Sequence, residues 1–342
     1  MSKEQDNFFR WSIIGHRNVV SYLQNNLKNL HTAHAYLFVG PAHVGKSTIA
    51  KDFVTSLVCR NLHNESFLVP CGECDCCKQI ANNIHPDVYW ISRETNEKTG
   101  KLKKNISIEQ IRELQNKLNL HSFLDSYKVA IVEEAQTLSQ EAANSLLKTL
   151  EEPTQKTVII LLATNISLLP QTIVSRCRVI KFLPVDPKDI FDYLVSLKVD
   201  RKKAKTLTAL SFGRPGIALD YFFQSQEYAD FEEQVQQFIT LMKASSNQRF
   251  QIVNELVESN DIDQVKNILL IWIKVIRDLL LIKNGLENSI SNLNISAELE
   301  QLAKSYQSNN LIGGLNRIGL AKRYLDANVN PRLTLENLVL NF

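Results

Sequence analysis

The residues with the clearest chemical signature lie at positions 40–47, where the chain reads G-P-A-H-V-G-K-S. Gly40, Gly45, Lys46 and Ser47 occupy every fixed position of the phosphate-binding pattern G-x-x-x-x-G-K-[ST]. In such a loop the backbone N–H groups and the positive helix N-terminus surround the phosphates, the lysine adds a charge and the hydroxyl binds Mg²⁺. The alternative, a glycine turn with a chance Gly-Lys-Ser, does not account for the strand and helix patterns that flank the loop.

Two acidic residues supply a second part of such a site. Glu133 and Glu134 follow the apolar run 129–132, which predicts a buried strand. A carboxylate at the end of such a strand holds Mg²⁺, directly or through water, and a second one orients and deprotonates an attacking water. A solvated acidic pair is the alternative, and the position at the end of a buried strand argues against it.

Polar residues also follow the next strand and precede the last one. Thr164 and Asn165 end the apolar run 158–163, where a side chain can bind the water or the γ-phosphate. Arg176 lies between a short predicted helix and the last predicted strand. An arginine there is either a salt-bridge partner within the fold or a finger directed at a phosphate, and the residues alone leave both open.

Five of the six cysteines lie in one short segment, between Cys59 and Cys77. Cys59, Cys71, Cys74 and Cys77 have the spacing C-x₁₁-C-x₂-C-x₂-C, and four thiolates form a closed tetrahedral shell suited to structural Zn²⁺. Cys76 is the alternative to Cys77, and the two-residue spacers favour leaving it out. Free thiols explain so dense a cluster poorly, and four thiolate ligands leave no open position for a catalytic zinc.

The elements that must position these residues alternate between strands and helices. Apolar runs predict strands at about 34–39, 88–92, 128–133, 157–163 and 178–182, and amphipathic patterns predict helices at 47–58, 108–120 and 139–150. This alternation is typical of a parallel sheet with helices on both faces. We therefore expect an α/β fold with a five-stranded parallel sheet.

The chain changes character after the last predicted strand. Prolines at 184 and 187 predict a linker, after which 189–197, 202–211 and 214–223 predict a three-helix unit and longer helices follow from about 227. The stretch 264–282 is apolar around most of its circumference, so it is a buried helix or one that packs against another chain, and we expect the second to hold in part. The expected domains are 1–183, with a cysteine module inserted at about 59–77, then 184–225 and 226–342.

The bulk composition is that of a globular protein of two or three domains. Its 39 basic and 36 acidic residues give a net charge of +3, so nucleic-acid binding requires a local patch. The N-terminal segment is polar and charged, and no apolar run reaches the ~20 residues that a bilayer crossing needs. We expect a cytoplasmic protein without a membrane partner.

Six short motifs, read together, carry a resemblance to a known family. They are A-H-A-Y-L-F-V-G-P at 33–41, C-G-E-C-D-C-C-K at 71–78, H-P-D-V at 85–88, I-S-I-E-Q-I-R-E-L at 106–114, A-N-S-L-L-K-T-L-E-E-P at 143–153 and S-R-C at 175–177. In combination they resemble the bacterial clamp-loader subunits of DNA polymerase III, and among these the δ′ type. The resemblance covers about residues 11–220 in detail, and the C-terminal third matches in its helical pattern and length.

The resemblance implies an AAA+ ATPase module, a three-helix lid and a helical collar. It also implies that the collar joins five subunits, including γ/τ and δ, into a hetero-pentameric ring that places the sliding clamp on primer–template DNA. ATP or ADP with Mg²⁺ and a structural Zn²⁺ at the four cysteines are the implied cofactors. The implied roles are Walker A for Gly40, Gly45, Lys46, Ser47 and Thr48, Walker B for Glu133 and Glu134, first sensor for Thr164 and Asn165, second sensor for Arg214, and an arginine finger on a neighbouring subunit's ATP for Arg176.

Two departures from the family pattern bear on hydrolysis by this chain itself. His43 replaces the middle glycine of the usual G-P-x-G-x-G-K, and a Cβ there disfavours positive φ. Glu133 stands where relatives usually have Asp, and its extra methylene displaces a ligand of Mg²⁺, whose octahedral geometry tolerates little deviation. We expect nucleotide binding to survive better than turnover. The alternatives are a self-sufficient γ/τ-type motor ATPase and a structural subunit whose nucleotide site does not hydrolyse.

Overall fold

A computed structural model of the chain describes residues 8–62, 64, 68–96, 100–124, 126–259 and 261–340. The chain divides into two compact units. Unit 1 comprises residues 1–190 and 213–216, and unit 2 comprises residues 191–212 and 217–342. The finer division into a lid and a collar stays a prediction.

Unit 1 contains the sheet and its flanking helices. In chain order its elements are α1 (Arg17–Lys28), β1 (Ala35–Val39), α2 (Lys46–Val58), α3 (Asp75–Ala81), β2 (Val88–Ile91), α4 (Ile108–Asn119), β3 (Lys128–Val132), the 3₁₀ turn η1 (Ala135–Thr137), α5 (Gln140–Glu151), β4 (Thr157–Ala163), the 3₁₀ turn η2 (Ile166–Leu168), α6 (Gln171–Val174) and β5 (Arg178–Lys181). The strands, and the helices predicted at 47–58, 108–120 and 139–150, agree with the sequence patterns to within one residue at each end.

The strands of the described residues form one five-stranded sheet with the order β2-β3-β4-β1-β5. Every pairing in it is parallel, so the predicted α/β fold is confirmed. Because parallel strands all end at the same edge, the segments that follow β1, β3 and β4 lie together there.

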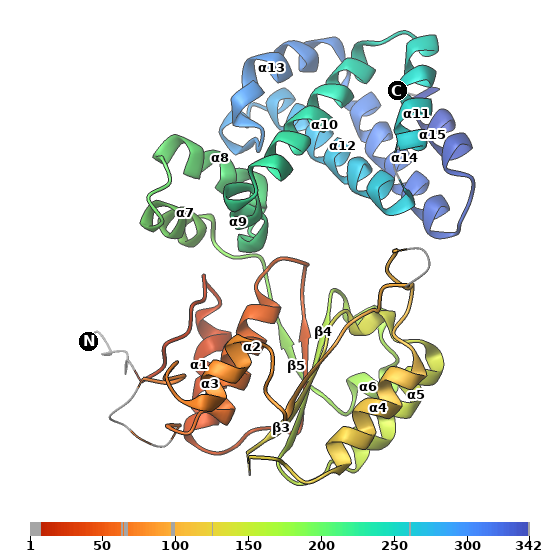
Figure 1. Cartoon of the computed structure of the whole chain (residues 1–342). Helices are drawn as coiled ribbons and strands as arrows, with labels where there is room; N and C mark the ends of the chain where they lie inside the picture. Colours follow the sequence, from red (N-terminus) through yellow and green to blue (C-terminus); the bar gives the residue numbers. More distant parts are fainter. Residues whose placement is uncertain are drawn as a thin grey trace. The chain divides into compact units, whose positions relative to one another are not determined.

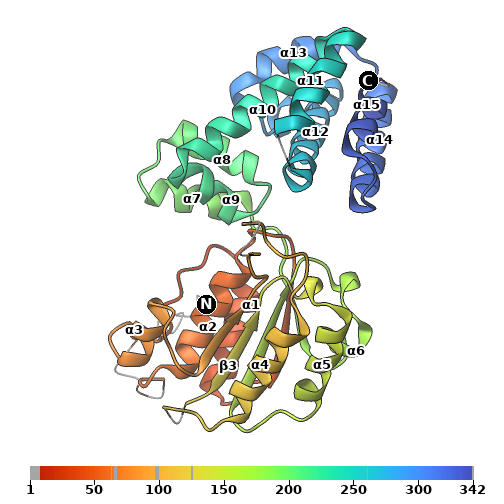
Figure 2. The same cartoon turned by 45° about the vertical axis from the view of Figure 1, so that its right-hand side comes forward.

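Helices cover both faces of the sheet, with α1, α2 and α3 on one face and α4, α5 and α6 on the other (Figures 1 and 2). Alternate residues of β1 point to opposite faces. Leu37 lies in a buried cluster that includes Leu146 of α5, whereas the Tyr36 ring lies 5.4 Å from the Phe53 ring of α2. Burial on both faces explains why the central strands are almost continuously apolar.

Side-chain caps fix where the helices of the sheet layer begin. At the start of α4 the Ser107 hydroxyl accepts a hydrogen bond from the Gln110 backbone N–H, and the Ser107 backbone N–H donates to the Gln110 side chain at 3.1 Å, which completes a capping box. Ser139 caps α5 by accepting from the backbone N–H of Ala142 at 3.1 Å. These polar residues satisfy N–H groups that the first helical turn leaves unpaired.

Helices make up the regular structure of the described residues after β5. They are α7 (Pro187–Ser196), α8 (Arg201–Ser211), α9 (Pro215–Phe223), α10 (Ser225–Lys243), α11 (Ser246–Ser259), α12 (Ile262–Lys283), the 3₁₀ turns η3 (Glu287–Ser289) and η4 (Leu293–Ile295), α13 (Ser296–Ser305), α14 (Ser308–Asp326) and α15 (Pro331–Leu340). Among the helices described, none has the length and apolar character that crossing a bilayer requires.

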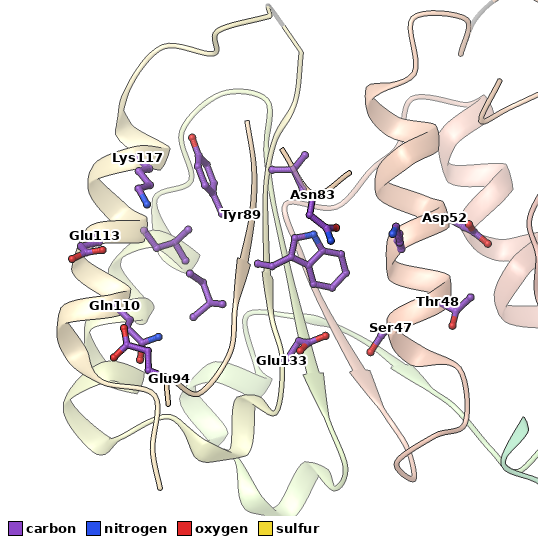
Figure 3. Close-up of a pocket in the computed structure, with 15 residues that line it drawn as sticks. Ser47, Thr48, Asp52, Asn83, Tyr89, Glu94, Gln110, Glu113, Lys117 and Glu133 are labelled. Atoms are coloured by element: carbon purple, nitrogen blue, oxygen red, sulfur yellow. The ribbon is translucent and has the colours of Figure 1, made fainter. Parts of the chain in front are cut away.

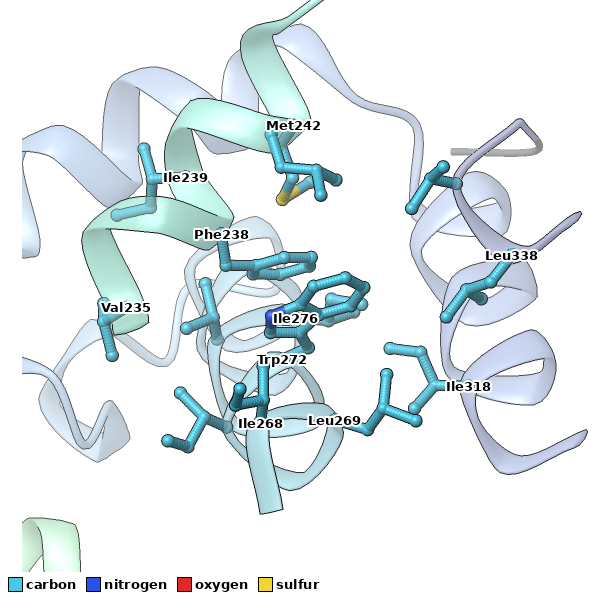
Figure 4. Packing of buried hydrophobic residues seen from close by; sticks show 14 of the residues in the cluster. Val235, Phe238, Ile239, Met242, Ile268, Leu269, Trp272, Ile276, Ile318 and Leu338 are labelled. Carbon is cyan, nitrogen blue, oxygen red and sulfur yellow. The ribbon is translucent and has the colours of Figure 1, made fainter. Parts of the chain in front are cut away.

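Helix α12 forms the centre of the core of unit 2. Its Trp272 is 2% exposed and stacks on Phe238 of α10, with ring centroids 4.7 Å apart (Figure 4). Ile276 of α12 and Ile318 of α14 are fully buried in the same cluster. The apolar circumference of the predicted helix at 264–282 is thus largely explained by packing within this chain. Contact with another chain stays a prediction.

A buried carboxylate organises the connection between α12 and α13. Asp278 is fully buried and accepts hydrogen bonds from the backbone N–H groups of Ser291 and Asn292 at 3.0 and 2.9 Å. The Asn292 side chain donates at 2.8 Å and Arg277 pairs with the same carboxylate at 3.1 Å. Asp278 thereby satisfies the polar backbone of a buried turn.

Replacing this carboxylate should destabilise unit 2. In Asp278→Ala the backbone N–H groups of Ser291 and Asn292 lose their acceptors, so we expect a loss of about 3 kcal/mol in the free energy of unfolding. Urea unfolding measures it when followed by the fluorescence of Trp272 in a Trp11→Phe, Trp90→Phe background, because Trp272 is the sole tryptophan in the sequence of unit 2. Asp263→Ala, at a side chain that is 87% exposed, is the matched control. Equal stability of the two variants would contradict this role of Asp278.

Candidate functional site

The phosphate loop connects the end of β1 to the start of α2, and two of its glycines are required for different reasons. Gly45 precedes α2 with φ of 106°, a conformation that side chains rarely adopt. Gly40 lies so close to the backbone of Phe182 that a Cβ on it would be 2.3 Å from the Phe182 carbonyl oxygen. Gly45 therefore permits the turn that leads into α2, whereas Gly40 permits the loop to close against the backbone of Phe182.

Lys46 is the first residue of α2 and is only 8% exposed. Its Nζ donates hydrogen bonds to the carbonyl oxygens of Gly40 and Pro41 at 2.6 and 2.7 Å. Burial lowers the pKa of this ammonium group to about 8. The lysine therefore places a titratable positive charge inside the loop, beside the positive end of the helix.

His43 adopts a left-handed conformation with φ of 61°, which its Cβ disfavours. A residue with a side chain in this region is strained, by about 1 kcal/mol or more, and persists where its surroundings hold it. The carbonyl oxygen of His43 accepts a hydrogen bond from the backbone N–H of Gly216 at 2.9 Å. The loop thus keeps the backbone geometry of a glycine despite the substitution.

The two acidic residues after β3 have different partners. Glu133 lines a pocket of about 810 Å³ together with Ser47 and Thr48 of α2 (Figure 3). Burial, and then the charge of Glu134, raise the pKa of Glu133. Glu134 has φ of 46° and accepts a hydrogen bond from Nε of Arg93 at 2.8 Å. The structure thus brings Glu133 to the predicted magnesium ligand Ser47 and holds Glu134 against Arg93.

Thr164 and Asn165 follow β4 at the same edge of the sheet, where the backbone N–H of Gly40 donates to the carbonyl oxygen of Ala163 at 3.2 Å. The Thr164 N–H donates to the side chain of Gln136 at 3.3 Å. Asn165 caps η2 by accepting from the N–H of Ser167 at 3.0 Å. Both predicted sensor residues are exposed beside the phosphate loop.

Arg214 is brought to the same region by the segment 213–216, which belongs to unit 1. The backbone N–H of Val185 donates to the carbonyl oxygen of Gly213 at 2.7 Å, and Gly216 bonds to His43. Arg214, half-buried between these two anchors, therefore lies in a segment fastened to the phosphate loop.

Arg176 lies at the opposite edge of the sheet. It precedes β5, whose first residue, Arg178, pairs with Tyr36 near the start of β1. The loop glycine Gly40 follows four residues later, which at about 3.3 Å per residue is roughly 13 Å further along the strand direction. The Arg176 guanidinium instead forms an ion pair with Glu151 at 2.6 Å. The structure does not bring Arg176 together with the other predicted nucleotide-site residues of its own chain.

The four predicted zinc ligands come together, with their Sγ atoms all within 4.8 Å of one another. Cys59 follows the last residue of α2, and the Sγ atoms of Cys71 and Cys77 are 3.9 Å apart. A hydrogen bond from Cys77 is the main cause that lowers the pKa of the Cys59 thiol to about 5. Burial instead raises the pKa of Cys76, which lies outside this group.

Three residues that contact the site are not predicted by the sequence patterns. Arg93, which binds Glu134, has no motif around it that signals this contact. His16 lies before α1, yet its Nε2 is 2.9 Å from the carbonyl oxygen of Val44 in the phosphate loop. Gly216 belongs to the G-R-P-G segment, whose two glycines are the one signal that the backbone approaches something closely there.

Two models of known protein families match this chain. A family model described as DNA polymerase III, delta subunit, matches residues 15–186. A second, described as DNA polymerase III, delta subunit, C terminal, matches residues 229–342. Together they span both the phosphate-loop unit and the helical C-terminal part.

Individual relatives cover the chain to different extents. The delta' subunit of DNA polymerase III from Bacillus subtilis is 27% identical over 327 residues, which is 94% of each chain. The delta' subunit from Pseudomonas aeruginosa is 37% identical over 145 residues, 42% of each chain. The tau subunit from Bacillus subtilis is 36% identical over 166 residues, and the match spans 48% of this chain but only 27% of that protein.

Among solved structures, a gamma-subunit-related protein from Thermotoga maritima aligns with 94% of this chain and 97% of its own, at 18% identity and a TM-score of 0.47. The family models and the delta' relatives, taken with the parallel sheet and its helical C-terminal region, identify the family. The chain belongs to the δ′-type clamp-loader subunits of bacterial DNA polymerase III.

Proposed function

We propose that this chain takes part in ATP-dependent loading of the sliding clamp onto primed DNA, with Arg176 acting on ATP bound by a neighbouring subunit. Its partners are the γ/τ and δ subunits, in a hetero-pentameric ring. The clamp and the primer–template DNA are engaged through the assembled complex. The chain's own site binds ATP or ADP with Mg²⁺, and a structural zinc ion holds the cysteine module.

The position of Arg176 is the observation that carries this proposal. Its backbone lies at the end of the sheet remote from the phosphate loop of the same chain. An arginine that serves an ATP site from there must serve a site on another subunit. Its planar, permanently charged guanidinium suits a phosphoryl group in the transition state.

The ion pair that Arg176 makes leaves it available for such a role. The Arg176 and Glu151 side chains are 36% and 50% exposed. Exposed pairs of this kind contribute little to stability, because water screens them and ordering the side chains opposes them. Exchange of Glu151 for a phosphate on a neighbouring subunit therefore costs little.

The chain's own nucleotide site supports binding more strongly than hydrolysis. In this proposal Lys46, whose Nζ is bonded within the loop, and the N–H groups of the loop hold the phosphates, while Ser47 and Glu133, which line one pocket, hold Mg²⁺. Bound Mg²⁺ would neutralise phosphate charge there. Glu134 is the residue that would orient an attacking water, and its carboxylate is paired with Arg93. We therefore propose that this subunit binds nucleotide.

The cysteine cluster suits a closed zinc site. Four sulfurs around Zn²⁺ at about 2.3 Å would lie about 3.8 Å from one another. The Cys71 and Cys77 sulfurs are 3.9 Å apart, and the other separations within the group stay below 4.8 Å. Such a site is structural, because it ties the end of α2 to the segment 71–77 and has no position for substrate.

Removal of the arginine finger should be visible only in the assembled complex. In Arg176→Ala we expect the neighbouring ATP site to lose about 10³-fold in hydrolysis, and clamp loading to fall with it. ATPase and clamp-loading assays on the reconstituted complex measure both quantities. Arg178→Ala, the same loss of charge at a residue that packs on Tyr22 of its own chain, is the control. Unchanged activity of the Arg176→Ala complex would contradict the role in trans.

Nucleotide affinity should fall as the pH rises through the pKa of Lys46. Phosphate binding needs the charged lysine, and burial lowers its pKa to about 8, so the charged fraction of the free protein is lost above that pH. Between about pH 7 and about pH 9.5 the charged fraction falls from about 0.9 to about 0.03, so we expect a loss of about thirtyfold in affinity for fluorescent ADP. Lys46→Gln should bind weakly at every pH. A wild-type affinity that does not change over this range would disprove the assignment.

Zinc content should depend on the four clustered cysteines and not on Cys76. Purified full-length protein is expected to carry about one zinc ion per chain, as a closed four-cysteine site does. Cys71→Ser should lose most of it, whereas Cys76→Ser should keep it. Metal analysis of the three proteins decides the matter, and loss of zinc in Cys76→Ser would show that the ligand set is wrong.

A further inference from the structure

The carbonyl groups of His43 and Val44, two successive residues of the phosphate loop, accept hydrogen bonds from donors outside the loop. The His43 oxygen accepts from the backbone N–H of Gly216 at 2.9 Å. The Val44 oxygen lies 2.9 Å from Nε2 of His16. Because a carbonyl oxygen can only accept, Nε2 of His16 carries the proton. The two donors come from residues about 200 positions apart in the chain, and both belong to unit 1.

The His16 ring itself packs against Phe182, the residue after the end of β5. Its ring centroid lies 5.0 Å from that of Phe182. The backbone N–H of Phe182 donates to the carbonyl oxygen of Val39 at 2.7 Å, and its own carbonyl is the group against which Gly40 closes. His16 therefore contacts Val44 in the loop while its ring packs against Phe182, which also contacts the start of the loop at Gly40.

Gly216 reaches the loop from the other side, and there is little room between them. A Cβ on Gly216 would lie 3.0 Å from both the Cβ and the carbonyl oxygen of His43. The segment that carries Gly216 is anchored by the hydrogen bond between Val185 and Gly213. The approach is thus backbone to backbone, and it needs glycine at this position.

From these contacts we infer that His16 and the backbone of Gly216 form a two-point clasp that holds His43 in its left-handed conformation, so that His16 is a positioning residue for nucleotide binding. This inference rests on the proposed nucleotide-binding function of the loop. A strained residue persists where its surroundings over-determine it, and two anchored donors on successive carbonyls supply that constraint. With both carbonyls bound from outside, the loop is ordered before its N–H groups meet a phosphate, which lowers the entropy lost on binding.

The clasp also accounts for the departure at position 43. Glycine adopts positive φ without strain, whereas histidine needs the conformation imposed. The dependence on His16 should therefore be specific to a chain that carries histidine at 43. This conditional dependence separates a clasp from a general contribution of His16 to folding.

The first test is titration of the full-length protein with N-methylanthraniloyl-ADP and Mg²⁺, followed by fluorescence anisotropy. His16→Ala should weaken binding about tenfold, because the strain at His43 is no longer offset. His16→Gln, whose amide can donate to the same carbonyl, should restore most of the affinity. His31→Ala, at an exposed histidine outside the site, is the matched control and should leave the affinity unchanged. Equal affinity of wild type and His16→Ala would overturn the clasp.

The second test places the same change in a His43→Gly background. Glycine does not need the clasp, so His16→Ala should cost less than about threefold there. An undiminished tenfold loss in that background would overturn the inference and assign His16 a general structural role. Thermal unfolding midpoints show that each variant folds. If His16→Ala does not fold, Gly216→Ala tests the other point of the clasp, and wild-type affinity in that variant would likewise overturn it.

The two proposals fail in different ways. If wild-type protein does not bind the fluorescent nucleotide, the nucleotide-binding part of the proposed function is wrong, and the role of the clasp in binding is wrong with it. If wild type binds and the His16 variants bind equally well, the proposed function stands and the clasp alone is wrong.

Discussion

The parallel pairing of β1 with β4 is the interaction on which the rest of the nucleotide site depends. It places the end of β1 beside the end of β4, and β3 follows on the far side of β4. The phosphate loop, the acidic pair and the sensor residues all begin where these strands stop. Because every strand runs in the same direction, one edge of the sheet collects the groups that could touch a nucleotide. Because β5 is also parallel to β1, Arg176, which precedes β5, lies at the opposite edge of the sheet, where the strands begin.

The phosphate loop meets the requirements for binding a nucleotide, whereas His43 and Glu134 depart from the usual arrangement. Gly40 and Gly45 meet the steric demands of the loop, and Lys46 is buried within it. His43 nevertheless adopts a strained conformation, and Glu134 forms an ion pair with Arg93. These features weigh differently on binding and on hydrolysis, since binding needs an ordered loop and a charge, whereas hydrolysis also needs a free, positioned base. The proposed role, in which the chain binds nucleotide and Arg176 serves the ATP site of a neighbouring subunit, fits this balance.

Much of the fold could be predicted from the sequence, because its signals are local. Strand and helix boundaries in unit 1 follow apolar periodicity and capping residues such as Ser107 and Ser139. The cluster of four cysteines follows from their spacing. The partner of Arg176 could not be predicted, since Glu151 reaches it through the packing of α5 and α6. The apolar helix α12 was ambiguous for the same reason, as its pattern does not say which helices surround it.

The sequence by itself determined the α/β class, the phosphate loop and the four clustered cysteines, because each depends on residue types at short spacing. The tertiary structure decided which residues support that loop. His16 and Gly216 contact successive carbonyls from segments about 200 residues apart, and Arg93 contacts Glu134 from the end of a neighbouring strand. Such contacts join backbone atoms or side chains that no local pattern marks, so only the folded chain brings them together. The conformation of His43 belongs to the same group, because steric preference argues against it and tertiary hydrogen bonds maintain it.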